Sequence, residues 1–386
     1  MVLKKIKKKF ISAIPSDYRN ILIKSKVKID YDLPSNYSFR LASSSQDFEA
    51  VGRLIYHRYK KVGLSSNEAD EMRLSVYQAL PNSAILIMCY DDKVVGTVSL
   101  LGDSDIGLPS EKISNIESLK NKYRCSEVSC LAIDESHKGK YLIYLFKYLY
   151  EVATKLLKVD YLVITTVDKT KTAELLYEPI LLFKEAYGSK KIQYQDANGM
   201  PCKTQILNVA NAHHYYKAHY SSYKKEKNLY YFFRKFNCTS FNLAYKINIP
   251  NPITYDAAFD VLLKNKYVKR QITKNMIPHI LSFYAGSPYE EDIKKYLHTD
   301  YMISPYKRES QRFPCNEDAL IVSDKTYLEG KIINRSSEGL LMKLNFQPSI
   351  KLNNCKILIL HSNNELEQLD VTQIWNNSYL YGFKIP

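Results

Sequence analysis

The sequence predicts an α/β domain with a mixed sheet, followed by a helical connector and a C-terminal six-stranded β-barrel. Three observations predict this order. As far as residue 210, apolar strands alternate with amphipathic helices, as in α/β domains built around one sheet. Helical patterns then prevail as far as residue 300. After residue 301, short strands recur at regular spacing, as in small closed barrels.

These changes of pattern divide the 386 residues into four segments. We expect a basic N-terminal segment at 1–37, an α/β domain at 38–210, the connector at 211–300 and the barrel at 301–386. A chain of this length has enough residues for two or three separate cores.

The charge of the chain favours an anionic partner. Its formal net charge is +15, with a pI near 9.2, and a basic surface attracts nucleic acid, nucleotide ligands, acyl carrier protein or anionic membranes. Charge alone does not choose among these. Five lysines between residues 4 and 9 could touch anionic lipid at the inner membrane face, or could form a solvated tail.

Cysteine usage favours a cytoplasmic location. The seven cysteines are odd in number and form no C-x-x-C pair, which argues against a disulfide framework and against a zinc site. We therefore expect no metal. No apolar run is long enough to span a membrane.

Taken in order, the α/β segment begins with an amphipathic helix from about Asp47 to Leu64 and a second helical stretch from Glu68 towards Leu80. Two strands follow, at 83–90 and 94–100, separated by a short polar turn. This spacing predicts a hairpin.

The centre of the segment is a strand, a basic loop and a helix. A buried strand is expected from Glu127 to Ile133, and helical spacing of apolar residues runs from Leu142 to Leu156. The N-terminus of that helix would offer unpaired backbone N–H groups to a phosphate. The loop between them contains His137, Lys138, Gly139 and Lys140. A strand at 160–167, a helix that holds Ala173, Leu176, Tyr177 and Ile180, and a last strand at 203–209 complete the segment.

The order of these elements resembles the GNAT acyltransferase fold, and four motifs resemble its long-chain N-acyl amino acid synthase branch, a relative of the acyl-homoserine-lactone synthases. The motifs are IYHRYKKVG (55–63), VVGTVSLLGDSDIGLP (94–109), EVSCLAIDESHKGK (127–140) and LLYEPILLF (175–183). The resemblance covers about residues 38–210.

The resemblance implies roles for several residues. Glu127 would be the general base for the attacking amine, although a carboxylate that only pairs with Arg124 or with a lysine is the alternative. Backbone groups around Ser129, Cys130 and Leu131 would hold the thioester oxygen and the pantetheine arm. Tyr177 would protonate the leaving sulfur, unless it is simply packed in the core.

The phosphate loop departs from the glycine-rich pattern of the fold. Of the usual glycines only Gly139 is kept, between Lys138 and Lys140, and Tyr141 and Ile143 crowd the approach of a pyrophosphate. This weakens the case for acyl-CoA as donor and favours acyl carrier protein, whose surface is acidic. Cys130 has no paired histidine and is a poor candidate nucleophile.

The connector begins with aromatic residues interleaved with lysines, at 211–236. Such a stretch could stack single-stranded nucleic acid, but a partly buried helix accounts for it better, so nucleic acid is disfavoured as a partner. Further helices are expected at 255–269 and from Ser287, where Pro288 and Glu290 give a typical helix start.

The barrel segment resembles the PilZ domain. Its two signatures are R-x-x-x-R, here Arg308 and Arg312, and D/N-x-S-x-x-G, here Asn334, Ser336 and Gly339. The resemblance implies binding of cyclic di-GMP, whose phosphates and guanine edges suit arginine forks and short polar side chains. A barrel that serves only as a protein contact is the alternative.

Together these interpretations predict an N-acyltransferase regulated by cyclic di-GMP. It would move a long-chain fatty acyl group from acyl carrier protein, or from acyl-CoA, to the α-amine of an amino acid. Two other functions stay open. One is an acyl-homoserine-lactone-type synthase, which would use S-adenosylmethionine as acceptor. The other is a non-catalytic cyclic di-GMP receptor or adaptor with an idle acyltransferase fold.

Overall fold

The structure is a computed structural model that describes most of the chain after residue 22. Within the described residues, no helix combines the length and the apolar character needed to cross a membrane. The described residues are 23–24, 27–65, 71–80, 83–104, 106–137, 139, 141–168, 176–187, 189, 191–242, 256, 258–260, 265–297, 313–323, 326–337, 339–345, 352, 354–361, 365–377 and 380–385.

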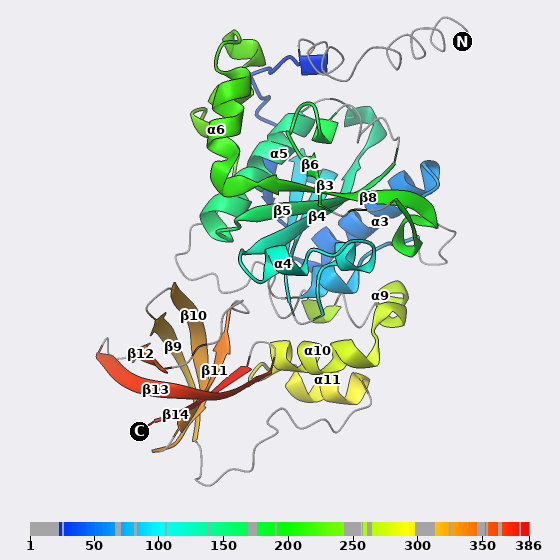
Figure 1. Ribbon diagram of the computed structural model, residues 1–386. Coiled ribbons are helices and arrows are strands. Elements are labelled where there is room, and N and C mark those ends of the chain that lie inside the picture. Colours follow the sequence, from blue (N-terminus) through cyan, green and yellow to red (C-terminus); the bar gives the residue numbers. More distant parts are fainter. Residues whose placement is uncertain are drawn as a thin grey trace, which may run out of the picture.

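The first part of the chain forms one mixed eight-stranded sheet in the order β1-β2-β3-β4-β5-β8-β6, with β7 also paired to β8 (Figure 1). β4 and β5 run parallel, and the other pairs are antiparallel. This is the α/β layout expected of the GNAT fold, so the predicted fold class is confirmed. The strands are β1 (Tyr37–Leu41), β2 (Ala84–Tyr90), β3 (Lys93–Gly102), β4 (Cys125–Ile133), β5 (Tyr161–Val167), β6 (Lys184–Glu185), β7 (Ile192–Tyr194) and β8 (Met200–Asn208).

The predicted hairpin is the pair β2–β3. Asp91 and Asp92 form its turn, with φ angles of 45° and 61°. Two successive residues with positive φ are the pattern of a type I′ turn, whose twist matches that of the flanking strands. Both strands are almost wholly buried, because helices cover both faces of the sheet.

Helix α3 (Ser45–Lys61) covers one face and helix α5 (Leu142–Glu151) the other. A capping box between Ser44 and Asp47 fixes the start of α3. α5 continues into the π-helical turn η4 (Val152–Leu156). Helices α6 (Val209–Tyr220) and α7 (Leu229–Arg234) join the core on the α5 face.

The helix expected from Glu68 to Leu80 is wrong in its described part. Residues 71–75 are not helical, and only the 3-10 turn η1 (Val76–Ala79) follows, opened by a capping box between Ser75 and Gln78. Ser75 breaks the helical pattern because its hydroxyl caps the start of η1, so a longer helix does not continue through this position. Other short helices are η2 (Pro109–Lys112), α4 (Glu117–Lys120), η3 (Glu135–His137), η6 (Gln195–Ala197) and η7 (Lys225–Lys227).

Within the expected connector, α6 and α7 pack with the sheet domain, and residues 265–297, called the connector below, hold α9 (Lys266–Gln271), η8 (Lys274–Met276), α10 (Ile277–Tyr284) and α11 (Glu290–Tyr296). Its buried residues, such as Val268, Leu281 and Ile293, share one core with Val51 and Ile55 of α3. The connector therefore packs on the α3 face of the sheet domain, and Figure 1 shows α10 and α11 beside the barrel.

The C-terminal part is a closed antiparallel barrel in the order β10-β11-β14-β13-β12-β9, so the predicted six-stranded barrel is confirmed. Its interior is filled by apolar side chains such as Ile321, Ile332, Met342, Ile357 and Phe383. The strands are β9 (Phe313–Ser323), β10 (Thr326–Arg335), β11 (Gly339–Leu344), β12 (Asn354–Leu360), β13 (Leu366–Asn377) and β14 (Leu380–Lys384).

The outer wall of the barrel contacts the turn between α10 and α11. Ala285 of that turn is buried against Leu341 and Leu380, with Ile333 packed beside them. In addition, the amine of Lys343 donates to the carbonyl oxygen of Ala285 at 3.3 Å. Burial lowers the pKa of Lys343 to about 7, as expected for an ammonium group taken out of water.

Candidate functional site

The central strand β4 is interrupted where the candidate site lies. Ser129 is paired with Ser99 and Ala132 with Thr97, so Cys130 and Leu131 oppose the single residue Val98. This is a β-bulge, and Cys130 lies in it with a φ of 55°. On its other side, β4 pairs with β5 only from Cys125 to Val128, although both strands continue. The two parallel strands therefore separate at the bulge, which leaves room for a ligand between them.

A cavity of about 130 Å³ opens at this separation on the α3 face. Glu127, Ser129 and Cys130 of β4 form its floor together with Thr165 and Val167 of β5. The wall comes from α3, from the segment around η1, from the turn around η6 and from the connector, through Tyr59, Leu64, Arg73, Leu74, Ser75, Tyr77, Tyr194, Asp196, Ala197 and Gln271.

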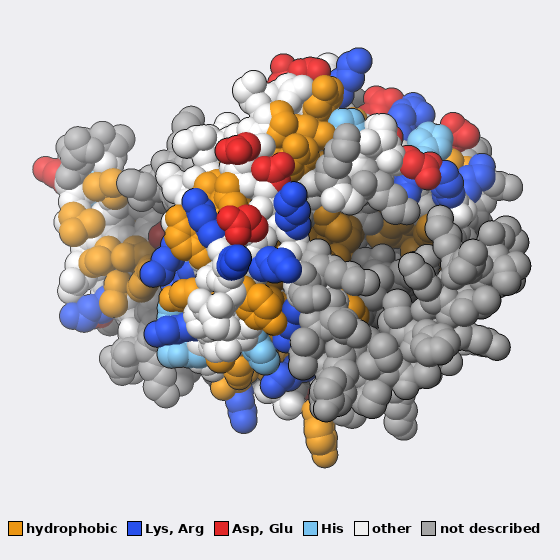
Figure 2. All heavy atoms as spheres, turned by 90° about the horizontal axis from the view of Figure 1, so that it is seen from above, with side chains coloured by type: hydrophobic (Ala, Val, Ile, Leu, Met, Phe, Trp, Pro, Cys, Tyr) orange, Lys and Arg blue, Asp and Glu red, His pale blue; other side chains and the backbone are white. Residues whose placement is uncertain are grey.

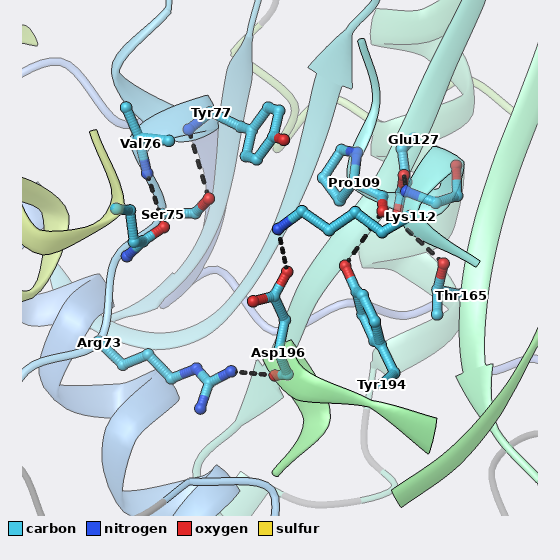
Figure 3. A network of polar contacts seen from close by, with 12 residues as sticks. Arg73, Ser75, Val76, Tyr77, Pro109, Lys112, Glu127, Thr165, Tyr194 and Asp196 are labelled. Carbon is cyan, nitrogen blue, oxygen red and sulfur yellow. Dashed lines mark hydrogen bonds and ion pairs between the residues drawn. The ribbon is translucent and has the colours of Figure 1, made fainter. Parts of the chain in front are cut away.

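Glu127 is a buried carboxyl group in this floor, with 2% of its surface exposed. The backbone N–H of Ser110 donates to its Oε2 at 2.7 Å, and the Thr165 hydroxyl donates to its Oε1 at 3.3 Å (Figure 3). Burial raises the pKa of Glu127 to about 7 despite these bonds. The alternative role, an ion pair with Arg124 or with a lysine, is not observed among the described contacts of Glu127. A carboxyl with this pKa can accept a proton near neutral pH.

Charged groups form the wall opposite Glu127 (Figure 3). The Arg73 guanidinium donates to the carbonyl oxygen of Leu64 at 2.8 Å and to that of Asp196, and lies over the ring of Tyr59 at 5.2 Å. The Asp196 carboxylate pairs instead with Lys112, at 2.8 Å. Arg73 is thus held in the wall by backbone oxygens and an aromatic face.

The thiol of Cys130 does not have the surroundings of a nucleophile. Burial raises its pKa, and its hydrogen-bond contact is the Ser129 hydroxyl at 3.6 Å. Thiolates are the reactive form, so this site favours a packing role, as expected from the sequence. Tyr59, beside it in the wall, is a residue that sequence reasoning missed, and burial raises its pKa above the usual range.

The structure does not bring Tyr177 into the lining of this cavity. Its ring packs against Phe146 at 6.1 Å and Phe183 at 6.0 Å between centroids. Burial raises its pKa above the usual value, so the phenol keeps its proton at all physiological pH values. That state suits a proton donor but is shared by any packed tyrosine.

A second cavity, of about 390 Å³, lies at the N-terminus of α5. It brings together Gly139 of the predicted phosphate loop and the N-terminal stretch Val27 to Asp30. The other lining residues are mostly apolar: Tyr141, Leu142, Ile143, Tyr144, Leu176 and Ile180. Because α3 and α5 cover opposite faces of the sheet, the two cavities lie on opposite sides of the separated strands.

Lys138 and Lys140 of the predicted phosphate loop lie outside the described residues. Around Gly139, the loop is packed by aromatic rings. The Tyr37 hydroxyl bonds the His137 ring at 2.7 Å, and the rings of Tyr37 and Tyr141 lie 4.6 Å apart. Tyr141 precedes α5 with a φ of 49°. Leu131 packs on the core of the α5 face.

The barrel residues form a separate candidate site. Arg308 and Arg312 lie outside the described residues. Asn334 is the second-to-last residue of β10, next to a bulge, and Ser336 closes the β10–β11 turn, with its backbone N–H donating to the carbonyl oxygen of Gly339 at 2.8 Å. Ser336 is buried, so part of its role is to hold this turn.

Arg335, inside the same motif, belongs to a charged network that sequence reasoning missed. Its guanidinium binds the Glu367 carboxylate with two bonds, at 2.5 and 2.7 Å. The His361 ring bridges Glu367, at 3.1 Å, and Glu317, at 2.7 Å. These two carboxylates raise the pKa of His361.

Gln271 links the connector to the cavity on the α3 face. Its side chain accepts from the N–H of Val76 at 3.3 Å and donates to the carbonyl oxygen of Leu74 at 3.0 Å. These two hydrogen bonds fix the backbone of the segment that carries Arg73. No local pattern marks Gln271 or Arg73 in the sequence, because both reach the site through tertiary packing.

Comparison with known proteins gives matches for the first part of the chain. The family model described as FeeM, N-acyl amino acid synthase, matches residues 50–203. No curated protein sequence matches the chain. The solved structure of FeeM, an N-acyl amino acid synthase from uncultured soil microbes, is similar at 19% identity over 46% of this chain and 93% of that chain, with a TM-score of 0.40. Spermidine N-acetyltransferase from Vibrio cholerae, solved in complex with CoA and spermine, is similar at 15% identity over 46% and 99%, with a TM-score of 0.34. The family match ends before the connector and the barrel begin.

Proposed function

We propose that this protein is an N-acyltransferase that moves a long-chain acyl group from a thioester to the α-amine of an amino acid. The observation that carries the proposal is Glu127, a buried carboxyl with a pKa of about 7 at the point where β4 and β5 separate. The family match over residues 50–203 supports the same reaction class.

Each part of the site has a role in the proposed transfer reaction. The amine attacks the thioester carbonyl, so a C–N bond forms and the C–S bond breaks. Glu127 accepts the proton that the amine releases, directly or through a water. Backbone N–H groups at the Ser129–Leu131 bulge stabilise the oxyanion. The departing thiolate receives a proton, and Tyr177 is our candidate donor.

The donor arm would enter from the α5 face and reach the separated strands. The cavity lined by Gly139 and the start of α5 is largely apolar, which suits a pantetheine arm. We favour acyl carrier protein over acyl-CoA as the donor, because the protein surface next to this cavity is basic.

That surface is formed by η7 and the stretch before β1. The N–H of Ile29, which lines the cavity, donates to the carbonyl oxygen of Glu226 at 2.7 Å, so the lysines of η7 border the cavity. Figure 2 shows the molecule from this end, with Lys and Arg side chains gathered among apolar ones. Exposed cations of these two segments are Lys28, Lys224 and Lys225. A surface of this charge attracts an acidic carrier protein.

We further propose that the barrel binds cyclic di-GMP through Arg308, Arg312, Asn334, Ser336 and Gly339, and that binding changes the transfer rate. The contact that supports this coupling is Ile333, the neighbour of Asn334. It lies in a bulge of β10 and packs against the α10–α11 turn at Gly286. From there the connector reaches the cavity through Gln271.

The test is mass spectrometry of products from the purified protein. It would be given acyl carrier protein charged with a long acyl chain, or the matching acyl-CoA, with a mixture of amino acids and S-adenosylmethionine. Each donor is tested with and without cyclic di-GMP. We expect N-acyl amino acids, more from the carrier protein, in a yield that depends on the dinucleotide. An acyl-homoserine lactone as product, or no product with either donor, would overturn the proposal.

A second arm separates the two proposed sites. Replacing Arg308 and Arg312 with alanine should abolish dinucleotide binding in calorimetry and the dependence of the rate on it, while the rate without ligand is kept. Unaltered binding would overturn the assignment of the barrel site and leave the acyltransferase assignment standing.

A further inference from the structure

The charges that line the α3-face cavity have a pattern that suits a zwitterion. Among the described residues that line it, Arg73 is the one cationic side chain, and Glu127 and Asp196 are the acidic ones. The Asp196 carboxylate already pairs with Lys112, which lies outside the lining. The cavity therefore presents a proton acceptor in its floor and a guanidinium in its wall (Figure 3).

Arg73 is held in a fixed position. Bonds to the carbonyl oxygens of Leu64 and Asp196 tie it to two separate segments, and its flat face rests on the Tyr59 ring. Hydrogen bonds from the Gln271 side chain fix the backbone on both sides of Ser75, next to Arg73. A guanidinium held in this way loses little conformational freedom when it binds a planar anion.

We infer that Arg73 binds the α-carboxylate of the acceptor amino acid while Glu127 receives the proton of its amine. A carboxylate is the anion that an arginine fork recognises best, often through two parallel N–H···O bonds. With the carboxylate at Arg73, the amine of the same molecule points across the cavity to the β4 floor. The inference rests on the proposed function and assigns Arg73 as the residue that selects a free α-amino acid over an amine or a peptide amide.

The inference is tested by comparing acceptors that differ only in the carboxylate. The full-length protein with its acyl donor would be given an accepted amino acid, the corresponding amino acid amide and the corresponding decarboxylated amine. We expect the wild type to prefer the amino acid in kcat/KM. Arg73→Gln should lower kcat/KM for the amino acid about 10- to 100-fold, mainly through KM, since one charged hydrogen-bonding partner is lost. Its kcat/KM for the amide should stay within a few-fold.

Two further variants test whether the loss of kcat/KM in Arg73→Gln comes only from a disturbed structure. Arg73→Lys keeps the charge but not the fork, so its KM should lie between those of the wild type and Arg73→Gln. Arg53→Gln, at an exposed arginine of α3 that pairs with Glu49, should behave as the wild type. Equal losses with the amino acid and the amide in Arg73→Gln, or a wild type that acylates the amide as well as the amino acid, would overturn the inference.

Failure of the proposed function has a different signature. If no acyl transfer occurs with any acceptor, binding of the amino acid and of its amide is measured by calorimetry. If the amino acid binds to the wild type but not to Arg73→Gln, the assignment of the carboxylate site stands and the proposed transferase activity is wrong. A wild type that binds no amino acid would overturn the carboxylate site.

Discussion

At the residue scale, the protonation state of Glu127 determines what the site can do. Its raised pKa, about 7, comes from burial, so the ionised, proton-accepting form becomes dominant only above pH 7. We expect kcat/KM to rise with pH through an apparent pKa near 7 and then level off. Glu127→Gln should lower kcat by about 10²- to 10⁴-fold, the usual contribution of a general base, and abolish this ascending limb. Steady-state rates from pH 5.5 to 9 measure both effects.

Glu49→Gln is the matched control for that experiment, because Glu49 is an exposed carboxylate of α3 that pairs only weakly with Arg53. It should keep both the rate and the pH profile. A Glu127→Gln variant with an unchanged rate would show that Glu127 is only a buried structural carboxyl.

The same carboxyl makes stability depend on pH. In the unfolded chain Glu127 titrates near the ordinary pKa of a glutamate, 4.5, and in the folded chain at about 7. The folded state therefore holds this proton more tightly, and stability contributed by the protonated form is lost as pH rises from 4.5 through 7. Above pH 8 the loss is on the order of 3 kcal/mol.

Glu127→Gln cannot ionise and avoids this loss. The variant should match the wild type in free energy of unfolding at pH 4.5 and exceed it at pH 8, as measured by denaturant titration. A variant that is less stable than the wild type at pH 8 would contradict the assigned pKa.

At the element scale, the bulge of β4 depends on the backbone of Cys130. Its φ of 55° is uncommon for any residue but glycine. Cys130→Gly should therefore keep the bulge and most of the activity, whereas Cys130→Val should cost about 1–2 kcal/mol of stability, because a β-branched side chain resists this conformation. Both variants lack the thiol. Thermal unfolding and transfer rates measured side by side check the expectation, and equal loss of activity in both would point to a chemical role for the thiol.

Much of the fold could be predicted from local patterns. The strands β2 and β3 and all six barrel strands were expected because their apolar alternation and turn residues are short-range signals. The helix expected before Leu80 failed because Ser75 caps a single 3-10 turn. The short strands β6 and β7 carry no periodic signal, since their ladder partner β8 supplies most of their contacts.

The candidate site was only partly predictable, for a related reason. Glu127, Ser129 and Cys130 share one strand, so a single motif identifies them together. Arg73, Asp196 and Gln271 are far apart in the sequence and meet only because the turn around η6 and helix α9 fold against the segment before η1. The pairing of Arg335 with Glu367 depends in the same way on barrel closure.

At the scale of the whole molecule, Gly286 connects the barrel to the connector. It has a φ of 72°, and a Cβ added there would lie 3.2 Å from the Ile333 side chain. Gly286→Ala should therefore displace the α10–α11 turn from β10. We expect it to remove most of the effect of cyclic di-GMP on the transfer rate while leaving the dinucleotide affinity within about three-fold. Transfer rates and calorimetry with the dinucleotide measure the two quantities.

Gly199→Ala is the control for backbone strain. Gly199 has the same φ of 72°, but nothing lies within 4 Å of the added Cβ. Both variants should lose about 1 kcal/mol of stability, and only Gly286→Ala should lose the response to the ligand. A full response in Gly286→Ala would show that the signal does not pass through this turn.

The position of Gln271 has a consequence for how the protein would sense its surroundings. Since the connector forms part of the acceptor cavity and also carries the barrel contact, two ligands acting through it would share one conformational equilibrium. Thermodynamic reciprocity then requires the amino acid to change the dinucleotide affinity by the same factor by which the dinucleotide changes the amino acid affinity. The dinucleotide concentration needed for a response would thus change with the amino acid concentration, so the response would depend on both ligands rather than on either one alone.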